Sequence, residues 1–477
     1  MKPPAACSIP ARVRAAEQTR LRRLGLIPPA AVPGVVTDGG WVPPAAWLAR
    51  GSGRRRTAPA QLRADLPWLR RMLEDAYIGW ARAARRGWDW DAFFRRWDRH
   101  LRGLRGRSVP TAAAFAPWRE FLAFQPDGHT GPLVPLGVGR GSQTLLLSPR
   151  ASDRPATAVR IADGSTRPLR RRAPEYRPRR VRVWRDGRLE AGRLLSLPAV
   201  WGAVRAVRIG GRWWGAEPVR PTPRRAAPER PVWQRWSPGG SYLRIPTLNP
   251  ENSRRLHRLA ARVRPAGARL VVDLRGNAGG SATAAIAALR ACLPDVAWTG
   301  SARIAWRWRD TAAARVLRWG WVQGRIVGGL KFRSDGTRRA AQKLLDLAGQ
   351  PSSSALHSGG MPLISPGPVP RAPPILVLAD GRCGSDGELL VWLLQQLPGV
   401  TVAGACTFGA VQFAQPGDGL LPHSRVSFRV ALAETDLYGD GRAVDGHGLP
   451  VDIVLPDAAS QAPDAIRALA DVLLPRR

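Results

Sequence analysis

One stretch, Ile375–Thr407, organises this chain and reads ILVLADGRCGSDGELLVWLLQQLPGVTVAGACT. Its first four residues are apolar and lie between a proline and a glycine, which is typical of a buried strand. Three glycines then surround Ser385, and the run Leu389–Leu397 is apolar without a helix breaker, which predicts a buried helix. The stretch therefore predicts a strand, a tight turn and a helix, with Ser385 in the first turn of that helix.

Ser385 at the start of a helix has two interpretations. The first amide groups of a helix have no intrahelical acceptor, and the helix dipole favours negative charge there. The position therefore suits a nucleophile whose reaction creates an oxyanion beside it. However, Ser385 followed three residues later by Glu388 is also a Ser-x-x-Glu capping box, which needs no chemistry. This stretch alone leaves both interpretations open.

The composition excludes several classes of protein. A formal net charge of +39 would ordinarily indicate a nucleic-acid or anionic-surface partner. All but three of the 74 basic residues are Arg, so we attribute the charge to a compositional bias and expect no nucleic-acid binding. The four cysteines form no CxxC pair and predict neither a zinc site nor a disulfide framework. No apolar run is long enough to span a membrane, and the N-terminus shows no clear signal peptide.

The chain divides into four segments by composition, consistent with two or three domains in 477 residues. Residues 1–60 are a Pro/Ala/Arg-rich tail or linker. Residues 61–130 show helical 3–4 spacing of apolar and aromatic side chains, which we interpret as a helical core. Residues 131–235 are basic and β-rich. Residues 236–477 alternate strands and helices and predict an α/β catalytic core with an insertion at 300–370.

The β-rich segment predicts two hairpins, because alternating strands flank Asp186-Gly187 and Gly210-Gly211. No residue of this segment is assigned to chemistry. Its Arg-rich block, 160–235, leaves open an alternative function as a binder of an anionic polymer, whose affinity should fall steeply with salt.

A second glycine loop, DLRGNAGG at residues 273–280, also lies between a predicted strand and helix. It is not G-x-G-x-x-G and lacks the acidic residue of a dinucleotide site, so we reject a nucleotide function. Two strand–loop–helix corners in one sheet can aim two backbone N–H groups at one point. That is the requirement for an oxyanion hole.

These motifs together resemble the S41 serine peptidases, which comprise C-terminal-processing and tricorn-type proteases. The resemblance is carried by DLRGNAGG, the Gly-Ser-x-x-Glu at 384–388, GACTFG at 404–409 and GHGLPVDIVLP at 446–456. It implies a crotonase/ClpP-like ββα-repeat core, a polypeptide substrate and no metal or organic cofactor. It also favours a periplasmic or extracellular location and leaves the oligomeric state undetermined.

The resemblance implies site residues one by one. Ser385 stands at the nucleophile, and the amides of Gly279 and Asp386 would form the oxyanion hole. The processing branch carries a Lys 25 residues after its Ser, whereas this chain has Ala410, so a Ser–Lys dyad is excluded at that position.

The tricorn-type branch is the nearer one, because Asp127-Gly128-His129-Thr130 resembles its D-G-H-T motif. The resemblance makes His129 the general base and Asp445 its carboxylate partner, where relatives more often carry Glu. Tricorn itself has a Ser where this chain has Gly128. A neutral imidazole can take the serine proton near pH 7, and a carboxylate on its other nitrogen holds the tautomer.

Three alternatives stay open. His447 competes with His129 for the role of base, and Cys383 competes with Ser385 for that of nucleophile. The missing Lys and the shorter carboxylate also allow a catalytically inactive, peptide-binding homologue that keeps the fold.

Overall fold

The computed structural model describes residues 11–23, 26–27, 35–37, 40–42, 55–133, 142–169, 176–199, 203–219, 230–236, 240–249, 252–263, 269–293, 296, 298–327, 335–349, 355–366 and 374–474. Within the predicted tail, 1–60, it shows helix α1 (Ala11–Arg23) and a small hairpin of β1 (Val35–Thr37) and β2 (Gly40–Val42). Most of the remaining tail lies outside the described residues.

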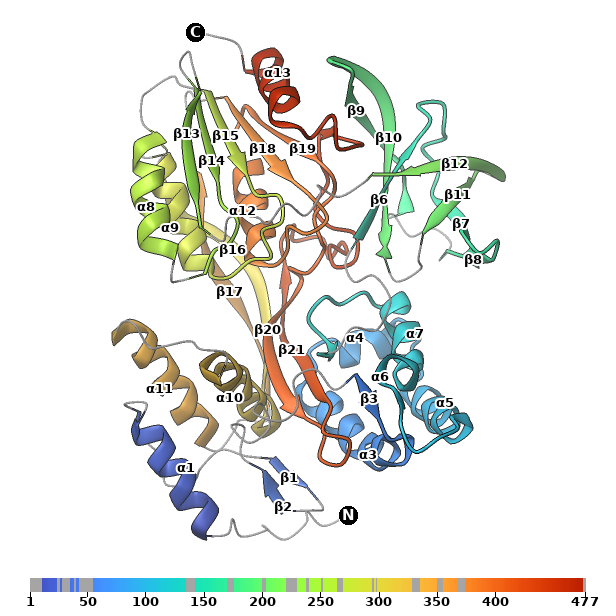
Figure 1. Cartoon of the computed structure of the whole chain (residues 1–477), viewed down its shortest axis with the longest axis vertical. Helices are drawn as coiled ribbons and strands as arrows, with labels where there is room; N and C mark the ends of the chain where they lie inside the picture. The colour runs from blue at the N-terminus through green and yellow to red at the C-terminus, as the bar shows by residue number, and fades with distance from the viewer. Residues whose placement is uncertain are drawn as a thin grey trace.

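The α/β core is built on parallel strands in the upper half of Figure 1. In spatial order they are β14 (Gly240–Arg244), β15 (Arg269–Asp273), β18 (Ile375–Ala379), β19 (Val400–Gly404) and β22 (Ile453–Val454). An antiparallel strand, β13 (Val232–Trp236), closes the edge beside β14. The helices are α8 (Ser253–Ala260), extended by a 3-10 turn (Ala261–Val263), α9 (Ala282–Cys292), α12 (Asp386–Gln395) and α13 (Pro463–Leu473).

The central strand β18 is buried on both faces, as its continuous apolar sequence predicts. Ile375 and Val377 pack in the cluster that contains α8, α9 and α12. Leu376 and Leu378 point the other way and pack with residues of α13. Because β15 and β18 are adjacent and parallel, their carboxyl ends open side by side at one edge of the sheet.

The middle segment continues the same sheet. Strand β9 (Arg179–Arg185) pairs in parallel with β22 and is followed in space by β10 (Arg188–Pro198), β6 (Ser142–Leu147), β12 (Arg212–Pro218), β11 (Val204–Ile209), β7 (Ala156–Ile161) and β8 (Thr166–Pro168), all antiparallel. Both predicted hairpins are confirmed. Their turn residues Asp186-Gly187 and Gly210-Gly211 all have positive φ, as two-residue hairpin loops require.

The N-terminal helices form the lower right of Figure 1. They are α3 (Pro59–Ala76), α4 (Trp80–Arg85), α5 (Trp90–Gly103), α6 (Thr111–Ala114) and α7 (Ala116–Phe124), with a two-strand pairing of β3 (Arg56–Thr57) and β4 (Val109–Pro110). The helices α6 and α7 are separated at Phe115, since Pro117 occupies the first turn of α7. The aromatic stripe is core, as predicted, with Phe93 and Trp97 fully buried.

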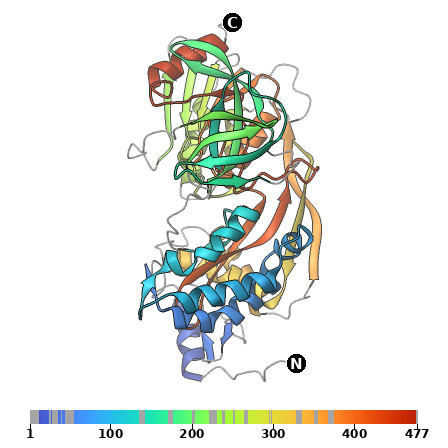
Figure 2. The ribbon, with the colours of Figure 1, turned by 90° about the vertical axis from the view of Figure 1, so that its right-hand side faces the viewer.

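A second sheet joins this helical region to the core, and the side view in Figure 2 shows its long strands running between the two. Its order is β17 (Ala355–Pro366), β16 (Trp298–Asp310), β21 (Ser427–Asp436) and β20 (Phe413–Leu420), and the short β5 (Gly131–Pro132) also pairs with β21.

The predicted insertion, 300–370, contains the helices α10 (Ala312–Val327) and α11 (Asp335–Gly349). It also contains the long pair β16–β17, which the sequence analysis did not predict. In β16 the alternation Trp306-Arg307-Trp308-Arg309 is typical of a strand but was interpreted as helical, and the glycines and prolines of β17 made that segment resemble a loop. The predicted fold class, an α/β core with a helical N-terminal region and a β-rich middle, is confirmed.

Candidate active site

The corner after β18 holds Ser385 in a strained conformation. Ser385 precedes helix α12 and has φ 54° and ψ −126°, a region that residues with a side chain rarely adopt. The segment before it is pinned from both sides: the Gly384 N–H donates to the Asn277 carbonyl at 2.9 Å, and the Phe408 N–H donates to the Cys383 carbonyl at 2.7 Å. The surrounding structure therefore imposes the strain on the serine.

Glu388, one turn into α12, is the hub of this corner. It is fully buried, and its Oε2 accepts the N–H of Ser385 at 3.0 Å and that of Ala410 at 2.8 Å. Its Oε1 accepts the hydroxyl of Thr407 at 2.5 Å and the N–H of Gly409 at 2.7 Å. Four donors point at the four lone-pair sites of the two oxygens, so this geometry suits the ionised carboxylate. Burial nevertheless raises the pKa of Glu388 to about 7, against the lowering effect of these hydrogen bonds.

The corner after β15 is stabilised differently. Asp273 is fully buried and paired with Arg275 at 2.7 Å and Arg244 at 3.1 Å, and it accepts the Tyr242 hydroxyl at 2.6 Å. Burial opposes the charge of Asp273, but the two guanidinium groups outweigh it and lower the pKa of its carboxyl. This corner is thus tied down by paired charge.

The two corners meet at Gly279. A Cβ placed on Gly279 would lie 2.8 Å from the Ser385 Cβ and 3.0 Å from the Asp386 nitrogen. Its φ of 98° also favours glycine. The backbone of Gly279 therefore lies directly against Ser385 and Asp386. The two residues predicted to form the oxyanion hole, Gly279 and Asp386, are neighbours in the structure.

The two N–H groups predicted to bind the oxyanion, those of Asp386 and Gly279, differ in whether they already donate a hydrogen bond. The Asp386 N–H, at the first position of α12, has no acceptor within the described parts of the chain. The Gly279 N–H donates to the Asn277 side-chain oxygen at 2.8 Å. Asn277 is itself fully buried and donates to the Ile245 carbonyl. An oxyanion at Ser385 would have to share or take the Gly279 amide from Asn277.

The DGHT segment reaches this site through strand β5. Asp127 accepts the N–H groups of His129 at 2.7 Å and Thr130 at 3.0 Å, which makes a tight turn. The Thr130 hydroxyl then accepts the Ala431 N–H of β21 at 2.9 Å. Pairing of β5 with β21 thus anchors a segment that lies more than 250 residues before Ser385.

Both the His129 segment and the Ser385 corner contact the same short stretch, residues 408–410. A Cβ on Gly128 would lie 2.4 Å from the Ala410 Cβ, and one on Gly384 would lie 3.4 Å from the Phe408 Cβ. Ala410 is buried. The small side chain of Ala410 and the missing side chain of Gly128 fit each other, so the two departures from the family pattern are one packing arrangement.

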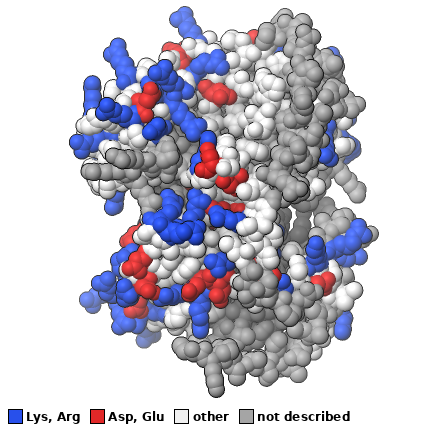
Figure 3. Space-filling model, turned by 180° about the vertical axis from the view of Figure 1, so that it is seen from behind, with Lys and Arg blue, Asp and Glu red and all other residues white. Residues whose placement is uncertain are grey.

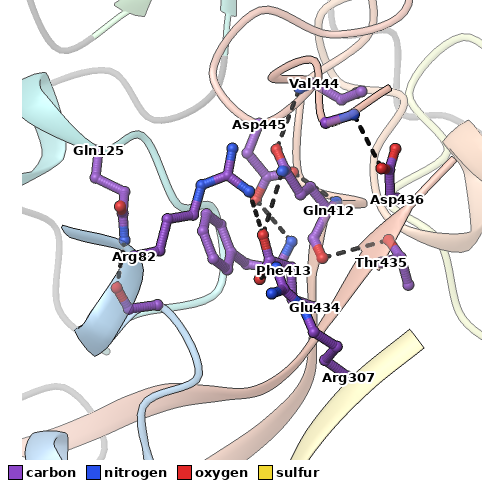
Figure 4. A network of polar contacts seen from close by, with 12 residues as sticks. Arg82, Gln125, Arg307, Gln412, Phe413, Glu434, Thr435, Asp436, Val444 and Asp445 are labelled. Atoms are coloured by element: carbon purple, nitrogen blue, oxygen red, sulfur yellow. Dashed lines mark hydrogen bonds and ion pairs between the residues drawn. The ribbon is translucent and has the colours of Figure 1, made fainter. Parts of the chain in front are cut away.

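Asp445 binds the backbone of residues 411–413, which directly follow the stretch 408–410 (Figure 4). Its carboxylate accepts the N–H groups of Val411 at 2.8 Å, Gln412 at 2.7 Å and Phe413 at 3.3 Å. Burial and the nearby carboxylate of Asp127 raise the pKa of Asp445 well above its usual range. Its bonds therefore give it a structural task, and its role as partner of His129 stays a prediction.

The same close-up shows how the helical region is fastened to the second sheet (Figure 4). Glu434 of β21 is buried and accepts the guanidinium of Arg82 from α4. It also accepts Arg307 of β16 at 2.6 Å, and Gln412 lies 3.5 Å away. This network fixes the orientation of α4 beside the Asp445 segment.

The two rival site residues have other surroundings. Cys383 is fully buried, and burial together with the carboxylate of Glu388 raises the pKa of its thiol well above the usual range, which disfavours a reactive thiolate. His447 is tied to β10: its Nδ1 lies 3.2 Å from the Ser196 carbonyl, and its own carbonyl accepts the Ser196 hydroxyl.

Sequence reasoning missed the role of Glu388 and Thr407 as the clamp of the site. The Ser-x-x-Glu spacing indicated that Glu388 would turn back toward the Ser385 N–H, which it does. It could not indicate the remaining donors, which come from residues 407–410 after the next strand. Thr407 extends the clamp, since its hydroxyl also accepts the Leu449 N–H at 2.7 Å.

The described residues include neither a membrane-spanning helix nor a cluster of metal ligands. Among them, no helix combines the length and apolar character that crossing a bilayer demands. No group of three or more His, Cys, Asp or Glu side chains suited to a metal ion occurs in the described ranges.

Comparison with known proteins assigns the class. The family described as peptidase family S41 matches residues 240–455, which contain both glycine corners and the parallel strands. This match covers somewhat less than half of the chain and supports a peptidase of family S41 for residues 240–455. No curated protein matches the sequence.

Several solved structures match this chain. Mature CPAF complexed with lactacystin has 16% identity, a TM-score of 0.45, and a match over 87% of this chain and 99% of its own. The photosystem II D1 C-terminal processing protease has 16% identity, a TM-score of 0.35, and covers 87% and 98%. The tricorn protease has 16% identity, a TM-score of 0.25, and covers 49% and 18%. At these low values no residue role follows from them.

Proposed function

We propose that the protein hydrolyses peptide bonds of extended or C-terminal polypeptide segments through an acyl-enzyme, with Ser385 as nucleophile and His129 as general base. The observation that carries this proposal is Ser385 itself. It has positive φ in the corner after β18, is followed directly by Asp386, whose amide has no acceptor among the described residues, and packs against the Gly279 backbone of the other corner. A capping serine alone does not require this strain.

In the proposed reaction, the Ser385 hydroxyl oxygen attacks the substrate carbonyl carbon while its proton passes to His129. The carbonyl oxygen becomes an oxyanion next to the Asp386 amide, with the Gly279 amide as second donor. His129 then protonates the leaving amine, and water releases the acyl group by the same route. Asp445 would support the imidazolium as its carboxylate partner.

A fluorophosphonate probe tests the nucleophile directly, because it labels only an activated serine. We expect labelling of the full chain and none of the Ser385→Ala variant. A chain that takes up no probe, although it is folded, would instead support the peptide-binding homologue. The engaged Gly279 amide is the observation that favours that second candidate.

The branch of the family can be tested at Ala410. We propose the tricorn-type arrangement, so the base is His129 and not a lysine. Ala410→Lys should lower turnover, because a long side chain would displace Gly128 and the adjoining His129. A gain of activity in Ala410→Lys, with His129→Ala harmless, would instead identify a Ser–Lys enzyme that has lost its base.

Asp445→Asn tests the carboxylate partner. If Asp445 holds the tautomer of His129, turnover should fall, by as much as roughly 10⁴-fold. Because Asp445 also accepts three amides, the free energy of unfolding must be measured alongside. Full turnover in a folded variant would remove Asp445 from the catalytic set.

A further inference from the structure

An arginine-lined groove runs beside the candidate active site. One cavity of about 520 Å³ has five arginines and one acidic residue among its lining residues: Arg82, Arg86, Arg177, Arg179, Arg442 and Asp440. A second cavity of about 590 Å³ shares Arg179 and Pro450 with it and adds further residues of β9. We define the two together as the arginine groove. In the view from behind, one group of basic side chains lies left of centre at mid-height, and others are spread over the rest of that face (Figure 3).

The positive charge of the groove is only partly compensated. Arg82 is held by Glu434, and Arg442 pairs with Asp440 at 2.5 Å. Arg177 and Arg179 are exposed and have no ion-pair partner in the part of the chain that the structure describes. The groove therefore has guanidinium groups available for an anionic ligand, and these groups bind carboxylates well.

Two backbone segments, around Cys406 and around His447, lie between the groove and the candidate active site. Cys406, His447 and Gly448 line it, and the chain continues from Cys406 into the stretch 407–410, which packs against Gly384 and Gly128. The Thr407 N–H donates to the Leu449 carbonyl, which binds the two segments together. The groove therefore lies beside the chain segment that packs against the Ser385 corner.

The edge of β9 favours a polypeptide as that ligand. Strand β9 pairs with β10 over Arg179–Arg185, but among the described residues it pairs with β22 only at Arg182 and Val183. Within the ranges that the structure describes, no strand pairs with this edge of residues 179–181, which line the second cavity. An extended peptide can add to such an edge as a strand, whereas a nucleic acid or a free phosphate cannot.

We propose that the arginine groove binds carboxylate groups of an extended polypeptide and so gives the enzyme a preference for acidic segments. The preference rests on the proposed peptidase function, but the binding does not. The carboxylates can come from Glu and Asp side chains or from a C-terminus, and the ligands below distinguish these sources.

Binding is measured with the full-length Ser385→Ala protein, by fluorescence anisotropy at low salt. The ligands are a labelled ten-residue Glu/Ala peptide with an amidated C-terminus, its Gln/Ala counterpart, and the Gln/Ala peptide with a free C-terminus. A single-stranded oligonucleotide of the same charge completes the set. We expect the Glu/Ala peptide to bind about tenfold or more tightly than the amidated Gln/Ala peptide, and more tightly than the oligonucleotide.

Two charge-matched variants locate the binding. Arg177→Glu combined with Arg179→Glu should abolish the preference for the Glu/Ala peptide. Arg105→Glu combined with Arg107→Glu, on an exposed loop after α5, should leave its Kd within about twofold. If only the free C-terminus restores binding to the Gln/Ala peptide, the terminal carboxylate is confirmed as a source.

Three results would overturn the proposal: equal affinity for the amidated Glu/Ala and Gln/Ala peptides, equal loss in both double variants, or an oligonucleotide that binds as tightly as the acidic peptide. The last result would assign the groove to nucleic acid. Acidic-peptide binding without fluorophosphonate labelling would leave the groove intact and refute the proposed function. Hydrolysis without any acidic preference would refute the groove alone.

Discussion

The two glycine corners both connect a strand to a helix beside Ser385, but the pKa of the buried carboxyl group is shifted in opposite directions in the two corners. At the corner after β15, the buried carboxylate of Asp273 faces two guanidinium groups, and its pKa is lowered. At the corner after β18, the buried carboxylate of Glu388 faces only amide and hydroxyl donors, and its pKa is raised to about 7. One corner therefore stays charged at any physiological pH, and the other titrates near neutrality.

The two carboxylates have different partners because the two corners hold different parts of the site. The first corner offers backbone atoms at Gly279 and needs only rigidity, which charge pairing supplies. The second must hold Ser385 in a strained conformation and keep residues 407–410 next to it. A carboxylate with four donors connects both tasks, because Ser385 and Ala410 share its Oε2.

The largest expected effect comes from removing the nucleophile of the second corner. Ser385→Ala should lower peptide turnover by roughly a millionfold, as loss of a catalytic serine does elsewhere. The free energy of unfolding should change by no more than about 2 kcal/mol, the upper range for loss of a helix cap. Turnover and urea denaturation measure the two effects. Wild-type turnover in this variant would end the assignment.

The next largest effect tests the contact between the corners. Gly279→Ala places a Cβ within 3.0 Å of both Ser385 and Asp386 and should lower kcat by about 10²–10³-fold, the cost of losing one oxyanion donor. Gly276→Ala is the matched control, since Gly276 also has positive φ but no atom within 4 Å of the added Cβ. Equal loss of kcat in both variants would show that backbone strain, and not the oxyanion site, is responsible.

A smaller effect separates the two carboxylates. Glu388→Gln leaves two of four donors without an acceptor, each costing about 1–3 kcal/mol of stability, and should also lower kcat by about tenfold because Ser385 loses its anchor. Asp273→Asn breaks a buried ion pair and should cost about 3–5 kcal/mol. Its kcat per folded molecule should stay near that of the wild type. Urea denaturation and active-site titration give both quantities, and a reversed pattern of kcat would contradict the comparison.

The smallest effect is a difference in pH dependence. An imidazole ordinarily titrates near 6.5, and the pKa of Glu388 is about 7, so two groups must lose protons for activity. The slope of log kcat/KM against pH should approach two below both values, whereas a lone imidazole gives a slope of one. A slope of one across pH 5–6 would show that the protonation of Glu388 does not matter.

Stability should change with pH in the opposite sense. A carboxyl whose folded pKa is raised binds more protons in the folded state, so its contribution is complete below about pH 4.5 and is lost as pH rises through about 7. The free energy of unfolding should therefore fall in the window where activity rises. Urea titrations at several pH values measure it, and Asp273→Asn should not alter this trend.

Local sequence determined the elements and the corners. The apolar run Ile375–Leu378, the glycines around Ser385 and the helical run after it were sufficient for the strand, turn and helix, because short-range periodicity and turn chemistry specify such units. The same holds for the hairpins at 186–187 and 210–211. Family motifs then supplied the candidates Ser385, His129, Asp445, Gly279 and Asp386.

The tertiary structure decided what the candidates contact. Glu388 finds donors after the next strand, and Ala410 fits against Gly128. His129 is held in place by the strand that follows it, β5, which pairs with β21. None of these contacts is local, so no spacing in the sequence encodes them. The strands β16 and β17 and the arginine groove were likewise missed, because they form only when segments far apart in the chain are packed together.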